Sequence, residues 1–234
     1  MMVNTPGETA TGGVRLKAPG WPEILAGGAA YGASCLLVAV LLPLAKDAAV
    51  AGVVGLLVSG AMGLMAFAAA VLIRIRGLAA VGVRRARPRH FVVAAMLGLV
   101  AYAIVAVVYM LVSGDAQNVQ TSYQAAAAAG WWSLVLALVA GAIITPLGEE
   151  AFFRRVLANA LFARYHAWIA VVASAAVFAV AHGINPILPV AFVVGVLAAL
   201  LFRWSGSIWS GVVLHGVNNT TALLVPLLFA LAGA

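Results

Sequence analysis

The sequence predicts an all-α fold, a polytopic transmembrane bundle of seven to eight helices. Hydrophobic residues make up 65% of the 234 residues and charged residues only 8%. This composition excludes an ordinary water-soluble domain. Apolar stretches long enough to cross a bilayer recur along the chain, which indicates several spanning helices. The single cysteine, Cys35, excludes an internal disulfide.

The expected elements follow from where the apolar runs begin and end. Residues 1–20 are polar and are predicted to form a disordered cytoplasmic tail. The first apolar run is too long for a signal peptide and has no convincing cleavage site at its end. The second run is rich in small residues, which is typical of closely packed membrane helices. Spans are expected at residues 22–45, 48–73, 91–112, 131–147, 167–182, 187–203 and 208–230.

Positive charge predicts the orientation of these spans. With the N-terminus in the cytoplasm, every one of the thirteen Lys and Arg residues except Lys46 falls on the cytoplasmic side. We therefore expect a multi-pass protein of the inner (plasma) membrane with a cytoplasmic N-terminus. The arginine-rich loop 74–90 is interpreted as a sign of this orientation and not of nucleic-acid binding. His90, at the end of that loop, is expected to be solvated.

Two adjacent glutamates, Glu149 and Glu150, stand out because the chain has only six acidic residues. Apolar runs flank them, so they lie in or beside the membrane. An ionisable side chain there costs about 2.5–3.5 kcal/mol and is kept mainly for function or pairing. Arg154 follows Glu150 by one helical turn and is expected to pair with it. The simplest alternative is that Glu150 and Arg154 form a structural ion pair and nothing more.

Two later segments are expected to approach the glutamates. If the helix through Glu149 turns back near residues 165–167, the residue at the same level on the next helix is close to His182. His215 and Asn219 are four apart in the last span and share one helix face. Straight helices would leave the two histidines about 10 Å apart in depth. Helix tilt or an irregular segment after His182 would have to absorb that difference.

Together these groups suit the attack of water on an amide carbonyl. Glu149 is expected to accept a proton from water beside an imidazole, while Arg154 holds Glu150 ionised as a support. A second imidazole and an amide can donate hydrogen bonds to the developing oxyanion. No cofactor is certain, although Glu149, His182 and His215 could form an open three-ligand Zn²⁺ site. Against zinc, the chain has no His-Glu-x-x-His motif.

Three motifs, in this order, resemble those of the CPBP family of intramembrane proteases, also called the CAAX prenyl endopeptidase or Abi family. They are Glu149-Glu150-x-x-x-Arg154, Phe178-x-x-x-His182 and His215-x-x-x-Asn219, and the resemblance covers roughly residues 88–225. It implies that Glu149 is the general base on water and that His182 helps to hold this water. It also implies that His215 and Asn219 are oxyanion donors. The implied active site opens to the cytoplasmic face.

The resemblance divides the chain into three parts. These are the tail (1–20), the N-terminal transmembrane helices with the basic loop (21–87), and a CPBP-like catalytic bundle (88–230). The expected function is hydrolysis of a peptide bond in a membrane-associated peptide or protein, with the lipid bilayer as the other partner. Some classifications place the family among metalloendopeptidases, and others call it a metal-independent glutamate protease.

Two other classes of function remain open. Buried Glu, His and Asn side chains also relay protons in membrane transporters. Against a proton-coupled transporter, the two halves of the chain show no inverted repeat, and the polar residues cluster in the second half. The third class is a noncatalytic immunity or scaffold protein that keeps the fold, and the complete set of motifs argues against it.

Overall fold

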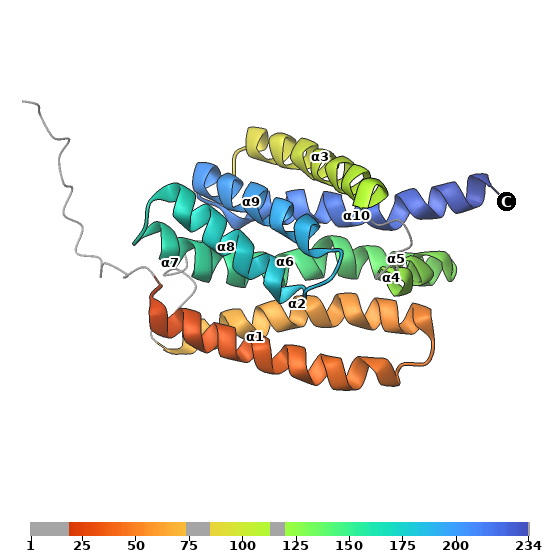
Figure 1. Cartoon of the computed structure of the whole chain (residues 1–234), viewed down its shortest axis with the longest axis horizontal. Helices are drawn as coiled ribbons and strands as arrows, with labels where there is room; N and C mark the ends of the chain where they lie inside the picture. The colour runs from red at the N-terminus through yellow and green to blue at the C-terminus, as the bar shows by residue number, and fades with distance from the viewer. Residues whose placement is uncertain (1–18, 74–84, 113–119, 234) are drawn as a thin grey trace, which may run out of the picture.

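A computed structural model shows a bundle of helices that lie along one common direction (Figure 1). It describes residues 19–73, 85–112 and 120–233. The predicted tail, most of the basic loop and the segment 113–119 therefore lie outside the described residues. Within the described ranges all regular structure is helical, which confirms the all-α prediction.

The helices match the expected spans closely in number and order. Five of those described are long and apolar enough to cross a membrane: Trp21–Leu44, Ala48–Ile73, Trp131–Phe162, Leu188–Ser205 and Ile208–Ala232. Two shorter apolar helices, Pro88–Ile104 and Ala167–Ala181, lie among them. The individual elements are α1 (Trp21–Leu41), η1 (Leu42–Leu44), α2 (Ala48–Ile73), α3 (Pro88–Val112), α4 (Thr121–Ala128), α5 (Trp131–Val139), η3 (Ala140–Ile144), α6 (Thr145–Phe152), η4 (Phe153–Ala158), α7 (Asn159–Phe162), α8 (Ala167–Ala181), α9 (Leu188–Ser205) and α10 (Ile208–Ala232).

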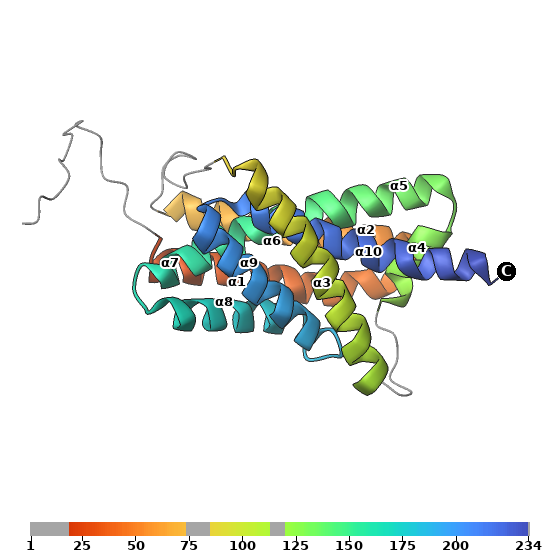
Figure 2. The same cartoon turned by 90° about the horizontal axis from the view of Figure 1, so that it is seen from above.

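The central helices of the bundle are α2, α6 and α10. In Figure 1 the layers run from α1 through α2, α6 and α10 to α3, and α8 and α9 pack together beside α6. Helix α2 contacts α1, α4 and α6, whereas α10 contacts α3, α9 and α6. Seen from above, α3 crosses α9 and α10 obliquely (Figure 2).

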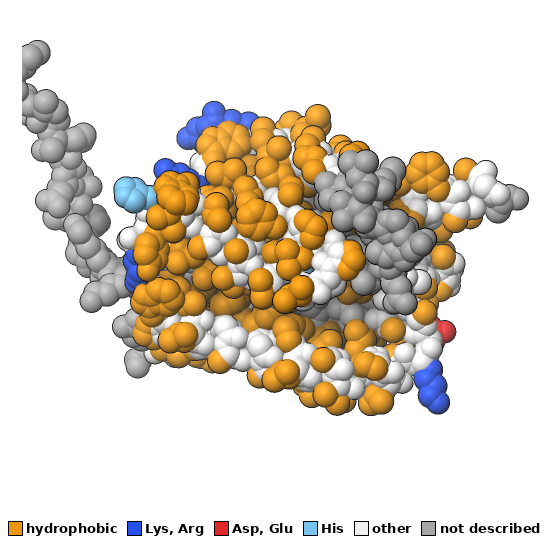
Figure 3. All heavy atoms as spheres, in the orientation of Figure 1, with side chains coloured by type: hydrophobic (Ala, Val, Ile, Leu, Met, Phe, Trp, Pro, Cys, Tyr) orange, Lys and Arg blue, Asp and Glu red, His pale blue; other side chains and the backbone are white. Residues whose placement is uncertain are grey.

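The two ends of the bundle differ in charge, and the surface between them is apolar. On the face seen in Figure 3, hydrophobic side chains cover the middle and charged groups gather at the ends. The turns from α7 to α8 and from α9 to α10 lie at one end together with the start of α3, and we call this the arginine end. It carries Arg89, Arg164 and Arg203. The opposite end carries the turn at Lys46 and Asp47 and is called the Lys46 end.

Glycines let α2 approach α6 with backbone against backbone. A Cβ atom placed on Gly63 would overlap the backbone of Gly148, and one placed on Gly148 would overlap the backbone of Gly60. Only residues without a side chain permit such contact between two helices. The small residues of α2 therefore pack as the sequence indicates, and they fix α2 against the helix that carries the two glutamates.

We expect Gly63→Ala to destabilise the protein by about 1–3 kcal/mol, because an added methyl group forces packed backbones apart. The matched control is Gly28→Ala in α1, where a Cβ atom meets nothing within 4 Å. Since alanine favours a helix over glycine, this control should be neutral or slightly stabilising. Thermal unfolding of the two variants in detergent checks the difference. Equal midpoints would contradict the close approach of α2 and α6.

One expectation about local structure is wrong. His90 is not solvated but 5% exposed. Its Nδ1 accepts a hydrogen bond from the backbone of Arg87, and its ring packs on Trp204. The helix of the fourth span continues past the glutamate pair as one 32-residue helix, Trp131–Phe162, and the residues after Glu150 pack their apolar side chains into the core.

Candidate active site

The helix that carries the glutamates contains two wide turns of π-helix, η3 before the pair and η4 after it. In η3 the backbone N–H of Thr145 bonds to Ala140 and leaves the carbonyl of Gly141 without its usual donor. The next residue, Pro146, has no N–H to offer. Asn219 of α10 supplies the missing bond, since its Nδ2 donates to the Gly141 oxygen at 2.8 Å. Pro146 thus gives a local reason for the wide turn and for the docking of α10 onto it.

Glu149 is completely buried, and its two carboxylate oxygens have different surroundings. Oε1 accepts a hydrogen bond from the hydroxyl of Ser59 in α2, at 2.6 Å. Oε2 has no hydrogen-bond partner among the residues that the structure describes. It lies 3.6 Å from Nε2 of His182 and 3.9 Å from Nε2 of His215. Oε1 is therefore held by a hydrogen bond, whereas Oε2 faces two imidazoles at distances too long for a direct hydrogen bond.

The backbone sets the proton position on His182. This residue ends α8, and its Nδ1 lies 2.8 Å from the carbonyl oxygen of Phe178. A carbonyl can only accept, so we assign the proton of the neutral ring to Nδ1 and the lone pair to Nε2. That lone pair faces Glu149, and the side chain is 25% exposed.

His215 reaches the same carboxylate from α10, although helix arithmetic placed it at a different depth. The turn between α9 and α10 is set back along the bundle relative to the turn between α7 and α8 (Figures 1 and 2). This offset compensates for the shorter distance of His215 from the start of its helix. The predicted convergence of Glu149, His182 and His215 is present in the structure.

Glu150 and Arg154 form the predicted ion pair behind the site. Both side chains are completely buried, and Nη2 of Arg154 lies 3.1 Å from Oε1 of Glu150. A Cβ atom on Gly211 would overlap the Glu150 carboxylate, so the glycine leaves space for this side chain in its present position. The guanidinium lies 4.6 Å from the ring centre of Phe178, a cation–π distance. The Glu150–Arg154 ion pair and the aromatic ring of Phe178 therefore pack behind the site.

Asn219 is tied to the backbone instead of pointing freely into the site. One of its amide hydrogens binds the Gly141 carbonyl, and its Oδ1 lies 3.4 Å from the amide nitrogen of Asn218. The second hydrogen on Nδ2 is left for other partners. Asn218 lines the same space as Asn219 and is 7% exposed.

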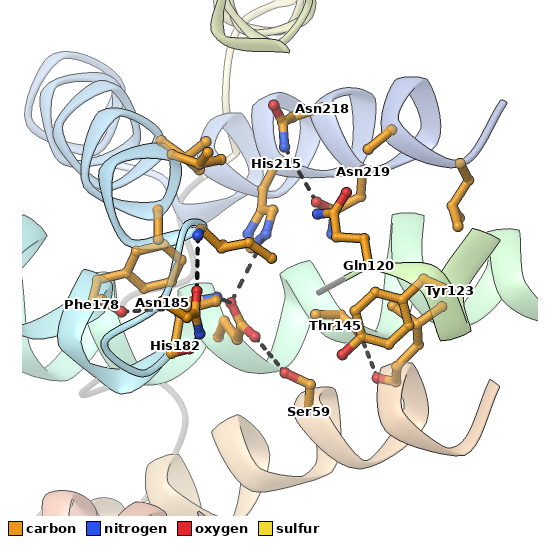
Figure 4. A pocket seen from close by; sticks show the side chains of 18 of the residues that line it. Ser59, Gln120, Tyr123, Thr145, Phe178, His182, Asn185, His215, Asn218 and Asn219 are labelled. Carbon is orange, nitrogen blue, oxygen red and sulfur yellow. Dashed lines mark hydrogen bonds and ion pairs between the residues drawn. The ribbon is translucent and has the colours of Figure 1, made fainter. Parts of the chain in front are cut away.

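A cavity of about 230 Å³ lies beside these groups. Figure 4 shows His215 and Asn219 approaching from α10, His182 from the end of α8 and Ser59 from α2. Glu150 and Arg154 do not line it, whereas several polar residues that sequence reasoning did not single out do: Ser59, Gln120, Tyr123, Gln124, Thr145, Asn185 and Asn218. Polar side chains inside an otherwise apolar region were the one available signal for Ser59 and Thr145.

The residues that could hold a metal do not form a metal site as they lie. No group of three or more His, Cys, Asp or Glu side chains in the described part of the chain has an arrangement that could hold a metal ion. The oxygen of Glu149 and the two imidazole nitrogens face one another at distances longer than a hydrogen bond. We therefore derive no chemical step through zinc.

The fold and the site define a class: a helical membrane protein with a carboxylate and two imidazoles beside a polar cavity in its interior. Residues 130–221 match the family described as type II CAAX prenyl endopeptidase, Rce1-like. The resemblance to the CAAX protease (CPBP) family that the three motifs indicate is thus confirmed over this part of the chain. No curated protein and no solved structure matches the chain.

The matched segment contains all three motifs but not the whole cavity. It begins in the turn before α5, so α2 and α4 lie outside it. Ser59, Gln120, Tyr123 and Gln124 are therefore contributed by parts of the chain that the family match does not cover. Helices α2 and α4 complete the wall of the site.

Proposed function

We propose that the protein is an intramembrane endopeptidase in which Glu149 activates water to hydrolyse a peptide bond of a membrane-associated substrate. The observation that carries this proposal is the buried Oε2 of Glu149. It lacks a hydrogen-bond partner among the described residues and faces the two imidazoles across the cavity. A buried carboxylate oxygen without a partner is costly, and a water molecule satisfies it.

The distances suit one bridging water. Separations of 3.6 and 3.9 Å are too long for direct hydrogen bonds and are spanned by a single water. Both Oε2 of Glu149 and Nε2 of His182 accept hydrogen bonds, so such a water would direct its hydrogens to them. Its oxygen lone pairs would then point into the cavity, toward a bound carbonyl. As the water oxygen attacks the carbonyl carbon, its proton passes to Glu149.

The tetrahedral intermediate needs donors for its oxyanion. His215, with its proton on Nε2, and the second amide hydrogen of Asn219 are the groups we propose for this role. The bond from Asn219 to Gly141 then orients the donor. Protonated Glu149 returns its proton to the leaving amine, which completes the hydrolysis.

A transporter would need a polar path through the bundle, and the described residues do not supply one. Between the glutamate pair and the arginine end, α6, η4 and α7 bury apolar side chains in the main core, among them Phe153, Val156, Leu157 and Leu161. The cavity therefore favours a reaction chamber with access from one side over a conduction path.

The proposal is tested with purified protein in lipid nanodiscs that also hold a library of membrane-anchored peptides. Mass spectrometry should find new peptide ends that depend on Glu149. Stripping divalent metals with a chelator should leave the rate unchanged, because in the proposed mechanism Glu149 itself takes the proton from water. A rate restored only by added zinc would overturn the direct role of Glu149 as base.

We expect Ser59→Ala to lower the cleavage rate by about 10–100-fold. Its hydroxyl holds Oε1 of Glu149, and a hydrogen bond to a charged group contributes about 1.5–3 kcal/mol. Ser59→Thr keeps a hydroxyl and should restore most of the rate. The matched control is Ser34→Ala, which removes a hydroxyl bonded to the carbonyl of Ala30 within its own helix. A Ser59→Ala enzyme as active as the control would contradict the positioning role.

A further inference from the structure

The side of the site that faces the arginine end is closed. Phe178, 1% exposed, lies against both imidazoles, with ring centres 4.6 Å from His182 and 5.9 Å from His215. Behind it lie the fully buried Arg154 and Phe153. The core cluster then continues through η4 and α7 toward the arginine end. Packed hydrocarbon in this direction leaves no room for a peptide.

The cavity extends from Glu149 toward the other end of the bundle. Its lining residues in α2 and α9 come from the half of each helix nearer the Lys46 end, and α8 contributes only its last turn with His182. Gln120, which precedes α4, and Tyr123 and Gln124 within α4 form one wall of the cavity. Helix α4 lies at the Lys46 end of the bundle (Figure 1). No turn from the arginine end takes part in this lining.

From these two observations we propose that the substrate reaches Glu149 from the Lys46 end, which the distribution of positive charge assigns to the extracytoplasmic side of the membrane. Twelve of the thirteen Lys and Arg residues lie on the other side of the predicted topology. The inference rests on the proposed function for the kind of substrate, and on the position of the cavity for the direction from which the substrate reaches Glu149. It differs from the cytoplasmic opening that the family resemblance implies.

The lining also indicates the chemistry of the substrate. The residues that line this cavity include no Lys, Arg or Asp, and Glu149 is the one carboxylate among them. Most of its other polar groups are hydroxyls and carboxamides, which pair with peptide N–H and C=O groups. Burial and the charge of Glu149 raise the pKa of Tyr123, so its phenol keeps its proton as a donor. An internal peptide segment without acidic side chains fits this site, since no cation offsets a second negative charge.

Accessibility to a membrane-impermeant maleimide tests the direction without any substrate. In a Cys35→Ala background, Gln124→Cys reports on the cavity, Lys46→Cys marks the Lys46 end and His166→Cys the arginine end. We expect Gln124→Cys and Lys46→Cys to react in intact cells, and His166→Cys only after permeabilisation. The proposal is overturned if Gln124→Cys reacts only after permeabilisation. It is equally overturned if Gln124→Cys stays unlabelled from both sides while the two controls react.

Cleavage then separates this inference from the proposed function. The same peptide library is displayed on the extracytoplasmic or the cytoplasmic side of one membrane anchor, with Glu149→Gln as the inactive control. Cleavage of extracytoplasmic segments alone, depleted in Asp and Glu around the cut, is the expected result. Cleavage of cytoplasmic segments alone would overturn the inference and leave the protease assignment standing. Cleavage of neither would overturn the protease assignment, and the labelling result would still decide the direction.

Discussion

Glu149→Gln should lower the rate of peptide cleavage by about 10²–10⁴-fold, the usual contribution of a general base. Glutamine has nearly the same shape and keeps an oxygen that accepts the hydrogen bond from Ser59. It cannot take a proton from water, so the loss falls on the chemical step. Single-turnover cleavage of an anchored peptide measures this loss directly, and substrate binding should change little.

The matched control is Glu23→Gln, which alters a buried glutamate of a different membrane helix, α1. Glu23 is 2% exposed, and its carboxylate accepts a hydrogen bond from the backbone of Gly20 at the start of α1. This variant should keep full activity. If Glu149→Gln retained activity within tenfold of wild type while remaining folded, another group would have to activate the water.

Arg154→Met should cost about 3–5 kcal/mol of stability, the largest effect we expect on folding. Removing one partner of a buried ion pair leaves the other charge uncompensated. Here both Glu150 and Arg154 are fully buried and 3.1 Å apart. Unfolding of the purified protein by heat or by SDS in mixed micelles measures the loss. Activity should fall as well, because Glu150 lies directly behind the site.

The double variant Glu150→Gln with Arg154→Met tests whether the pair acts as a unit. Neutralising both partners removes the unpaired charge, so much of the lost stability should return. The coupling between the two changes then isolates the pair from the packing of Arg154 on Phe178. Additive losses would show that Arg154 stabilises the protein mainly through packing.

The sequence predicts the centre of the site better than its walls. Glu149, His182 and His215 could be found because ionisable groups are rare at membrane depth and each one therefore needs a reason. Ser59 gave no comparable signal, since a single serine in an apolar helix is ordinary. Its contact with Glu149 depends on how closely α2 approaches α6, and that distance is set by glycines on both helices.

Depth was the part of the geometry that helix arithmetic could not supply. Counting 1.5 Å per residue assumes that every turn lies at the same level. The turn between α9 and α10 is set back, and this brings His215 to the carboxylate of Glu149. Packing between distant helices decides such offsets. For the same reason the direction in which the cavity extends from Glu149 was visible only once α4 was placed.

The π-turns around the glutamate pair make the site depend on residue count. An i→i+5 turn holds one residue more than an α-turn. In an α-helix, successive residues are rotated by about 100° about the helix axis. Deleting one residue from η3, such as Ala142, would let the backbone revert to a regular helix. The part of the helix beyond Phe153 could keep its apolar side chains in the core only if the part that begins at Trp131 rotated about the helix axis. The Gly141 carbonyl would then turn away from Asn219. The shortened helix would be more regular, but it would lose its hydrogen bond to α10.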